Sequence, residues 1–212
     1  MNDMPCQLYL ISPLDVGGSF PERLRKALAA GPVAAFQFRV KDVDPEEAAR
    51  LAEPLQAICD EFDVAFIVND DVALAKRLGA DGVHLGQGDE SLENARAALG
   101  KDVQIGITCH DSRHLAMEAG EGGANYVAFG AFFPTETKET RHKPELDLVQ
   151  WWAEMMELPC VAIGGITPDN CQPLIDAGAD FLAVCGAVWN DPAGPAAAVR
   201  KFADIMTAES AD

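Results

Sequence analysis

The stretch AFIVNDDVALAKRLGADGVHLGQGD, residues 65–89, holds two short apolar runs separated by a segment of helical spacing. The first run, residues 65–68, is followed closely by Asp70, and the second, residues 82–85, by Asp89. This pattern predicts a strand, a helix and a second strand. Strands joined through a helix run parallel, so both aspartates are expected at the same edge of the sheet. Two carboxylates at one edge suggest a site for a hard cation such as Mg²⁺.

The same unit recurs along the rest of the chain. Eight short apolar runs alternate with segments of helical spacing, from residues 6–11 at the start to residues 181–184 near the end. None of these runs alternates strictly between polar and apolar residues, which is typical of parallel strands buried on both faces. Gly-Ala-Asp or Gly-Ala-Asn precedes three of the runs, at residues 79–81, 123–125 and 178–180, where glycine is expected just past a helix.

The number of these units predicts an α/β protein of the (β/α)8 TIM-barrel type. Residues 1–212 are expected to form a single domain, with a frayed tail from residue 207. A doubly wound open sheet is the alternative. It is disfavoured because the strand count reaches eight and no Gly-x-Gly-x-x-Gly follows the first strand.

Two local patterns carry further expectations. Pro54 lies inside a helical pattern and predicts a kink or a break there. Thr167 and Pro168 predict a helix that begins directly after the turn at Gly164 and Gly165. Such a turn exposes backbone N–H groups beside a helix N-terminus, so a phosphate site is predicted after the seventh and eighth strands.

Composition limits the partners of the protein. A net charge of −18 over 212 residues argues against nucleic acid or an anionic membrane, although a few focused basic groups can still bind a small anion. No run is long enough to span a bilayer, and no signal peptide is recognised. The six cysteines lack Cys-x-x-Cys spacing, which predicts free thiols in a cytoplasmic protein.

Active sites of TIM barrels lie at the carboxyl ends of the strands. The polar residues that follow the predicted strands are Gln37, Arg39, Lys41, Asn69, Asp70, Gln87, Asp89, Thr108, His110, Thr135, Thr137 and Lys138. Arg39 and Lys41 are two residues apart and are expected to face the same way, near Lys138. Three cations beside two carboxylates predict a site for a di- or triphosphate with its metal. Surface ion pairs with neighbouring aspartates are the alternative for each cation taken alone.

The remaining candidates are assigned smaller roles. His84 is expected to be a hydrogen-bonded core residue, whereas His110 is either a general base or a hydrogen-bonding group across the barrel mouth. His142 is interpreted as a loop residue. Asp71 is expected to begin the helix that follows it. Trp151 and its neighbour Trp152 either cover the barrel or form a subunit contact, so a homodimer stays open.

Several of these segments together resemble the thiamine phosphate synthase family. They are QFRVK (37–41), VND (68–70), GADGVHLGQGD (79–89), IGITCH (105–110), FPTETK (133–138) and AIGGI (162–166). The resemblance covers most of the chain, in the same order, with each motif at a strand end. It implies a Mg²⁺-dependent transferase that joins hydroxymethylpyrimidine diphosphate to thiazole phosphate, giving thiamine phosphate and diphosphate. It also implies a dissociative mechanism, in which diphosphate leaves before the thiazole nitrogen captures a pyrimidine cation.

The resemblance further implies a role for each matching residue. Asp70 and Asp89 would hold Mg²⁺. The diphosphate would be held by Arg39, Lys41, Asn69 and Lys138, and the three cations among them would be catalytic, because they stabilise the leaving group. Gln37 and Thr108 would lie near the pyrimidine. The thiazole phosphate would be held by Thr135, Thr137, Gly165, Cys185 and Gly186. The family commonly has serine at the place of Thr108, so the hydroxyl is retained, and a serine near Cys185, where a backbone contact would survive.

Two other functions are compatible with this pattern. A related family of thiazole tautomerases shares the barrel and the thiazole phosphate site, and there His110 would be the catalytic candidate. Asp89, Lys41 and Lys138 favour the synthase, because tautomerases typically lack their counterparts. The other alternative is an inactive barrel that binds thiamine precursors.

Overall fold

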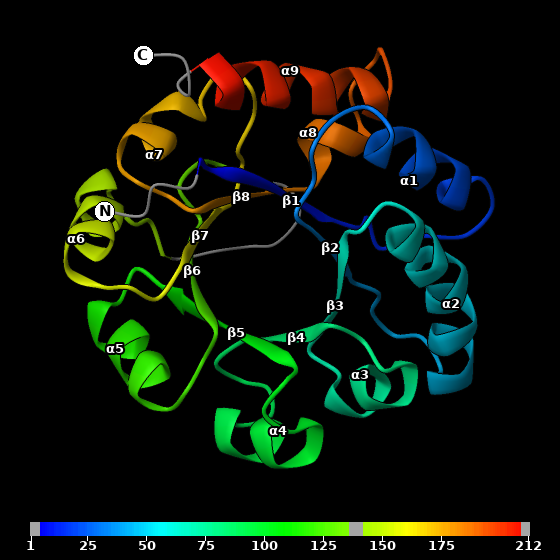
Figure 1. Ribbon diagram of the computed structural model, residues 1–212, viewed down its shortest axis with the longest axis horizontal. Coiled ribbons are helices and arrows are strands. Elements are labelled where there is room, and N and C mark those ends of the chain that lie inside the picture. The colour runs from blue at the N-terminus through cyan, green and yellow to red at the C-terminus, as the bar shows by residue number, and fades with distance from the viewer. Residues whose placement is uncertain (1–4, 136–141, 209–212) are drawn as a thin grey trace.

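Eight parallel strands form a closed barrel in the computed structural model, which describes residues 5–135 and 142–208. The strands are β1 (Gln7–Ile11), β2 (Ala35–Phe38), β3 (Ala65–Asn69), β4 (Gly82–Leu85), β5 (Gln104–His110), β6 (Tyr126–Gly130), β7 (Cys160–Ile163) and β8 (Phe181–Val184). They follow one another in chain order, and β8 pairs with β1 to close the sheet (Figure 1). The predicted TIM barrel is therefore confirmed, and the open sheet is excluded.

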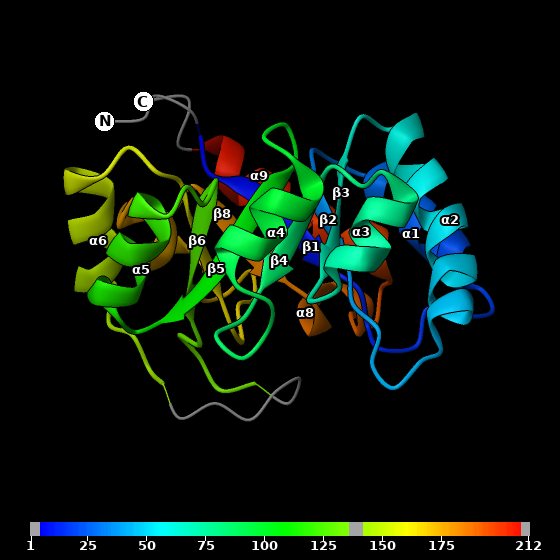
Figure 2. The same ribbon diagram turned by 90° about the horizontal axis from the view of Figure 1, so that it is seen from below.

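Helices surround the barrel and bury its outer face (Figure 1). They are α1 (Phe20–Leu28), α2 (Pro45–Glu61), α3 (Val72–Leu78), α4 (Leu92–Leu99), α5 (Arg113–Glu121), α6 (Leu146–Met155), α7 (Gln172–Asp176), α8 (Gly186–Trp189) and α9 (Pro195–Ala208). In the side view of Figure 2, α8 lies at one end of the barrel, where β8 ends. No helix among the described residues is long and apolar enough to cross a membrane.

Side-chain caps begin several helices just past the strands. The Asp71 carboxylate accepts a hydrogen bond from the Leu74 N–H at 2.8 Å, as expected for a residue that starts α3. Ser91 and Ser112 cap α4 and α5 in the same way. Trp152 is buried between α6 and the barrel. Trp151 packs under the Arg113 guanidinium, with 4.5 Å between Arg113 Cζ and the centre of the Trp151 ring. A subunit contact at this surface stays a prediction.

The repeated Gly-Ala-Asp/Asn turns join neighbouring strands at the amino end of the barrel. The side-chain oxygens of Asp81, Asn125 and Asp180 accept hydrogen bonds from the backbone N–H groups of Phe66, Ile105 and Cys160, at 2.7, 2.8 and 2.7 Å. In each case an N–H group of an odd-numbered strand donates to the residue directly before the next, even-numbered strand. The repeat therefore has a structural role: its last residue pairs an N–H group at the start of the neighbouring strand.

Three local expectations had different outcomes: a break at Pro54 and a helix that begins at Thr167 were wrong, whereas a kink at Pro54 and fraying of the tail stay predictions. Helix α2 passes through Pro54 without a break, because this proline lies on the exposed face, where the carbonyl that it leaves unpaired is accessible to water. No helix begins at Thr167; α7 begins at Gln172, because the Asn170 side chain closes a turn by accepting from Thr167 N–H and donating to the Gly165 carbonyl. Helix α9 includes Thr207, and residues 209–212 lie outside the described residues.

The repeat can be tested with one substitution at its third copy. Asp180→Ala leaves the buried N–H group of Cys160 without its acceptor, so the free energy of unfolding should fall by about 1–2 kcal/mol in urea denaturation. Asp180→Asn keeps an acceptor oxygen and should cost less. Equal stability of the alanine and asparagine variants would show that this hydrogen bond contributes little.

Candidate active site

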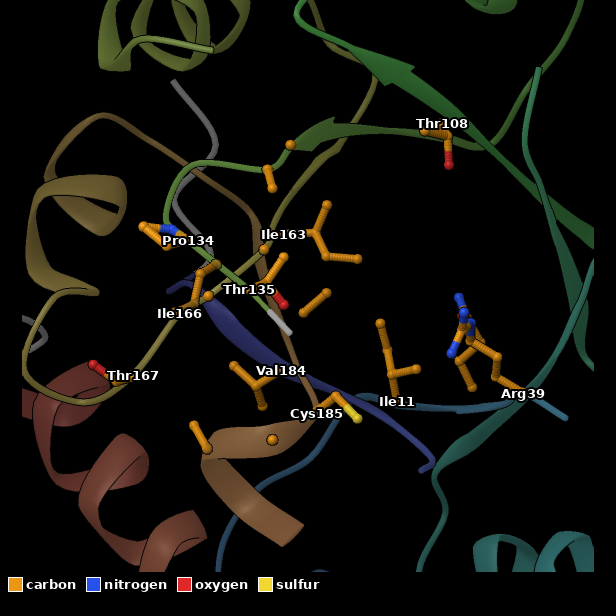
Figure 3. Close-up of a pocket in the computed structure, with 18 of the residues that line it drawn as sticks. Ile11, Arg39, Thr108, Pro134, Thr135, Ile163, Ile166, Thr167, Val184 and Cys185 are labelled. Atoms are coloured by element: carbon orange, nitrogen blue, oxygen red, sulfur yellow. The ribbon is translucent and has the colours of Figure 1, made fainter. Parts of the chain in front are cut away.

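A cavity of about 580 Å³ lies at the carboxyl ends of the strands. All eight strands, or the loops directly after them, contribute to its wall. The lining includes Ile11, Gln37, Arg39, Asn69, His84, Thr108, His110, Gly130, Thr135, Ile163, Gly165, Ala183, Cys185 and Gly186. Figure 3 shows Arg39 on one side of this cavity and Pro134, Thr135 and Ile166 on the opposite side. The cavity is thus the site that the barrel fold predicts.

A chain of hydrogen-bonded side chains lies at the base of the cavity. It joins Gln37, Tyr9, Tyr126, His84 and Thr108 in that order, with separations of 2.9, 3.0, 3.0 and 2.8 Å. The first four side chains are buried, and Thr108 is half-exposed to the cavity. His84 is therefore the hydrogen-bonded core residue that the sequence predicted.

Arg39 supplies positive charge to the cavity. Its backbone is fixed by Ser12, whose hydroxyl accepts from the Arg39 N–H at 2.9 Å and donates to the Arg39 carbonyl at 3.1 Å. The guanidinium Nη1 is buried and has no hydrogen-bond partner among the described residues. A buried charged donor without a partner is costly, so its retention beside a cavity points to an anionic ligand.

Glycine turns form the opposite wall. Gly164 and Gly165 have φ angles of 100° and 64°, in the left-handed region that favours glycine. A β-carbon on Gly165 would lie 2.4 Å from the Pro134 carbonyl oxygen, so the loops after β6 and β7 are in close contact. After β8, Gly186 begins α8 directly. This wall therefore combines backbone atoms at the glycine turns with apolar side chains such as Ile166 and Val184 (Figure 3), and the α7 N-terminus is displaced from it.

A second hollow of about 490 Å³ lies beside the first and shares Asn69 with it. Lys41 and Asp70 line this hollow, with 3.9 Å between Nζ and Oδ2. Arg39 and Lys41 thus line two adjacent hollows instead of one, contrary to expectation. The reason is that β2 ends at Phe38, so the alternation of a strand does not apply to the residues after it.

Asp70 and Asp89 lie close together, as the sequence predicted. Burial, and then the neighbouring Asp89 carboxylate, raise the pKa of Asp70 to about 6, while Lys41 opposes this shift. The Asp89 carboxylate is itself held by the Gly86 N–H at 2.7 Å. Two oxygen donors that repel each other are suited to a hard divalent cation, so the pair fits Mg²⁺. No set of three or more acidic, histidine or cysteine ligands is found within the described part of the chain, so a bound ion would need further oxygens from ligand or water.

Other predicted residues lie around these hollows. Gln87 donates to the Thr108 carbonyl at 2.7 Å and so fixes the end of β5. Thr135 lines the main cavity. Thr137 and Lys138 lie outside the described residues, and their assignments stay predictions.

Two residues beneath the cavity and one at its rim were missed or undervalued in the sequence. Tyr9 and Tyr126 match no motif, yet they are the two tyrosines of the chain and both fall in apolar runs, where a phenol needs a hydrogen-bond partner. The His142 ring stacks on His110, with 4.4 Å between ring centres, and its Nδ1 lies 2.8 Å from an Asp111 oxygen. His142 is therefore a residue of the cavity rim as well as of a loop.

Comparison with known proteins agrees with this geometry. The sequence model of the family described as thiamine monophosphate synthase matches residues 8–188. The chain belongs to this family. It is 66% identical over 210 residues to thiamine-phosphate synthase of Erythrobacter litoralis, covering 97% of this chain and 98% of the relative. The corresponding protein of Rhodospirillum centenum is 55% identical over 202 residues, covering 95% and 98%.

A solved structure gives the same result. Thiamine phosphate pyrophosphorylase from Pyrococcus furiosus superposes on this protein with a TM-score of 0.84. The two chains are 31% identical, and the match covers 95% of this chain and 96% of the other. Family membership thus rests on both sequence and fold.

Arg39 provides a first test of the thiamine monophosphate synthase site. In Arg39→Met the unliganded protein should melt at the same temperature or higher, because a buried hydrogen-bond donor without a partner is removed. Its affinity for inorganic diphosphate with Mg²⁺, measured by calorimetry, should fall at least tenfold, as expected for a charged hydrogen bond of about 1.5–3 kcal/mol. Arg25→Met removes an exposed arginine that pairs with Glu61 and should bind diphosphate normally. Strong destabilisation by Arg39→Met would assign the guanidinium a structural role.

The carboxylate pair provides a second test, based on pH. Because the folded protein raises the pKa of Asp70 from 3.8 to about 6, it binds this proton more tightly than the unfolded chain does. Stability contributed by Asp70 is therefore present at low pH and is lost as the pH rises through this window. Without metal, Asp70→Asn should melt higher than the wild type above about pH 6, and the difference should shrink at lower pH.

Asp71→Asn is the matched control, because it removes the adjacent charge but keeps a helix cap. Differential scanning calorimetry in the presence of a chelator makes the comparison. A pH-independent difference between Asp70→Asn and the wild type would show that the two carboxylates do not repel each other.

Proposed function

We propose that this protein couples hydroxymethylpyrimidine diphosphate with thiazole phosphate to give thiamine phosphate and diphosphate. The observation that carries the proposal is the buried, unpartnered Arg39 nitrogen, which lies across one cavity from the glycine turns after β7 and β8. A cavity with an anion-binding group at each end suits two phosphorylated substrates. The 66% identity to a thiamine-phosphate synthase supports the same transferase activity.

The diphosphate end comprises Arg39, Lys41, Asn69 and the two carboxylates. Asn69 lines both hollows, so a diphosphate bound there would reach Arg39 in one and Lys41 in the other. Asp70 and Asp89 would hold Mg²⁺, which when bound neutralises charge on the diphosphate oxygens. Lys138 is proposed to join this end from the loop after β6.

The thiazole phosphate end comprises the opposite wall. Backbone groups at Gly165, Cys185 and Gly186 would contact the phosphate oxygens, with the Thr135 hydroxyl beside them. Thr137 is proposed for the same group. Between the two ends lies the hydrogen-bonded base of the cavity, which would contact the pyrimidine through Gln37 and Thr108.

The side chains around the cavity favour a dissociative reaction. Burial raises the pKa of the Cys109 thiol to about 12 and that of Cys185 to about 11, so neither is a ready nucleophile. Arg39 and Lys41 can instead stabilise negative charge on the diphosphate as its bond to the pyrimidine carbon breaks. The thiazole nitrogen, oriented through its phosphate, would then capture the pyrimidine cation within the same cavity.

The proposed partners are thus small phosphorylated molecules. None of the cysteines within the described residues forms a disulfide, which supports a reducing, cytoplasmic site of action.

The decisive experiment mixes both phosphorylated substrates with Mg²⁺ and measures diphosphate release. The wild type should release diphosphate, and Asp89→Ala should lower the rate by roughly 100-fold or more while remaining folded, because charge stabilisation of several kcal/mol is lost. Full activity of Asp89→Ala would overturn the metal assignment.

The same assay separates the alternatives. Thiazole phosphate binding without diphosphate release by the wild type would favour the tautomerase or the inactive barrel. Isomerisation of the thiazole phosphate, followed by NMR, would then distinguish these two, with His110→Ala as the diagnostic variant.

A further inference from the structure

The hydrogen-bonded chain at the base of the cavity has a direction. It links five strands and places Gln37 of β2 at one end and Thr108 of β5 at the other. The Gln37 side-chain NH₂ donates to the Tyr9 hydroxyl, and each phenol then has a single proton to donate. The position of every proton along the chain follows from this first bond.

Consider the bond between the two phenols. Tyr9 already accepts from Gln37, so its own proton needs an acceptor, and the Tyr126 oxygen lies 3.0 Å away. If Tyr126 donated to Tyr9 instead, the Tyr9 proton would be buried without an acceptor among the described partners of this hydroxyl. Burial raises the pKa of Tyr9 to about 12 and also raises that of Tyr126 well above its usual value, so both phenols keep their protons. Tyr9 therefore donates to Tyr126.

The remaining protons follow in turn. Tyr126 donates to His84 Nδ1 at 3.0 Å, so Nδ1 is an acceptor without a proton and the imidazole proton lies on Nε2. His84 Nε2 then donates to the Thr108 hydroxyl oxygen at 2.8 Å, which leaves the Thr108 proton free to donate to a ligand. Figure 3 shows the Thr108 hydroxyl directed toward the cavity.

At the other end, the Gln37 amide is coupled to this order, because turning the amide over would require every bond along the chain to reverse. An isolated glutamine can turn its amide over and accept or donate equally well at either position. Here the NH₂ group is held by Tyr9, so the carbonyl oxygen is the group left for a ligand. The cavity base then offers one acceptor, at Gln37, and one donor, at Thr108.

We propose that Tyr9 and Tyr126 are positioning residues that fix this donor and acceptor pattern and so make the site select an aminopyrimidine over its deaminated, oxo form. An exocyclic amine donates to an acceptor, and an adjacent unprotonated ring nitrogen accepts from a donor. The oxo form presents a carbonyl and a ring N–H, which reverses both groups. This inference rests on the proposed function, because it specifies how that site would recognise the pyrimidine.

A second feature shows that the barrel leaves space for these hydrogen-bonded side chains. A β-carbon on Gly106 would lie 1.9 Å from Cζ of Tyr126, so glycine is required on β5 for the phenol to occupy its place. The Tyr126 ring also stacks on His84, with 5.6 Å between ring centres. The phenol thus has one position, from which it reaches both of its partners.

The first test reads the proton order without any substrate. In the wild type, ¹⁵N NMR of the imidazole nitrogens should place the His84 proton on Nε2, with His84→Gln used to assign the signals. Tyr126→Phe removes the donor to Nδ1 and should populate the other tautomer. Tyr9→Phe is the matched control, because Tyr126 can still donate to His84, and it should leave the His84 tautomer unchanged. A proton on Nδ1 in the wild type would overturn the proposal.

The second test measures selectivity as the ratio of kcat/KM for the aminopyrimidine diphosphate to that for its oxo analogue. In Tyr9→Phe the Gln37 amide is free to turn over, so this ratio should fall roughly tenfold, with KM for thiazole phosphate unchanged. Thr108→Val should also lower the ratio, and Thr108→Ser should restore it. An unchanged ratio in a folded Tyr9→Phe would overturn the proposal.

The two tests also separate this inference from the proposed function. If the wild type fails to couple the substrates, the proposed function fails, whereas the NMR measurement still decides the proton order. If the wild type couples them but shows the Nδ1 tautomer, only the inference fails.

Discussion

The closure of a parallel sheet is the constraint on which the rest of this molecule depends. Because β8 pairs with β1, every strand ends at the same rim, and residues far apart in the chain meet there. Tyr9 and Tyr126, for example, are 117 positions apart and share a hydrogen bond. The opposite rim is held by the Asp81, Asn125 and Asp180 side chains, which pair backbone N–H groups of neighbouring strands. One end of the barrel thus uses polar side chains to join neighbouring strands, and the other keeps polar groups for ligands.

The carboxyl rim has features that oppose stability in the absence of ligand. Arg39 keeps a buried nitrogen unpaired, and Asp70 lies beside a second carboxylate that helps to raise its pKa. Asp70 and His110 also adopt positive φ angles of 65° and 55°, which are uncommon for residues other than glycine. Such features cluster where binding or catalysis compensates for them. Their concentration at one rim agrees with the identity of this chain as a member of the thiamine monophosphate synthase family.

Sequence periodicity was sufficient for the strands, because each lies in an apolar run bounded by polar or glycine residues. It also placed Asp70 and Asp89 together, since that inference needs only parallel neighbouring strands. It failed for Arg39 and Lys41, because the backbone leaves the strand at Phe38 and period-two alternation no longer applies. It failed for Thr167 because a side chain three residues later, that of Asn170, closes a turn where a helix was expected. The order of protons along the hydrogen-bonded side chains could not be predicted from the sequence, since it depends on which groups the closed barrel brings into contact.

Gly106 has a consequence for how this family can vary. The missing side chain on β5 and the large ring on β6 are complementary volumes, so the two positions must change together. A relative with a larger residue at the position of Gly106 has to carry a smaller one at that of Tyr126. Such an exchange would keep the barrel filled while breaking the hydrogen-bonded path beneath the cavity. Covariation of these two positions would therefore distinguish, within a single fold, barrels that retain the hydrogen-bonded side chains at the base of the cavity from barrels that have lost them.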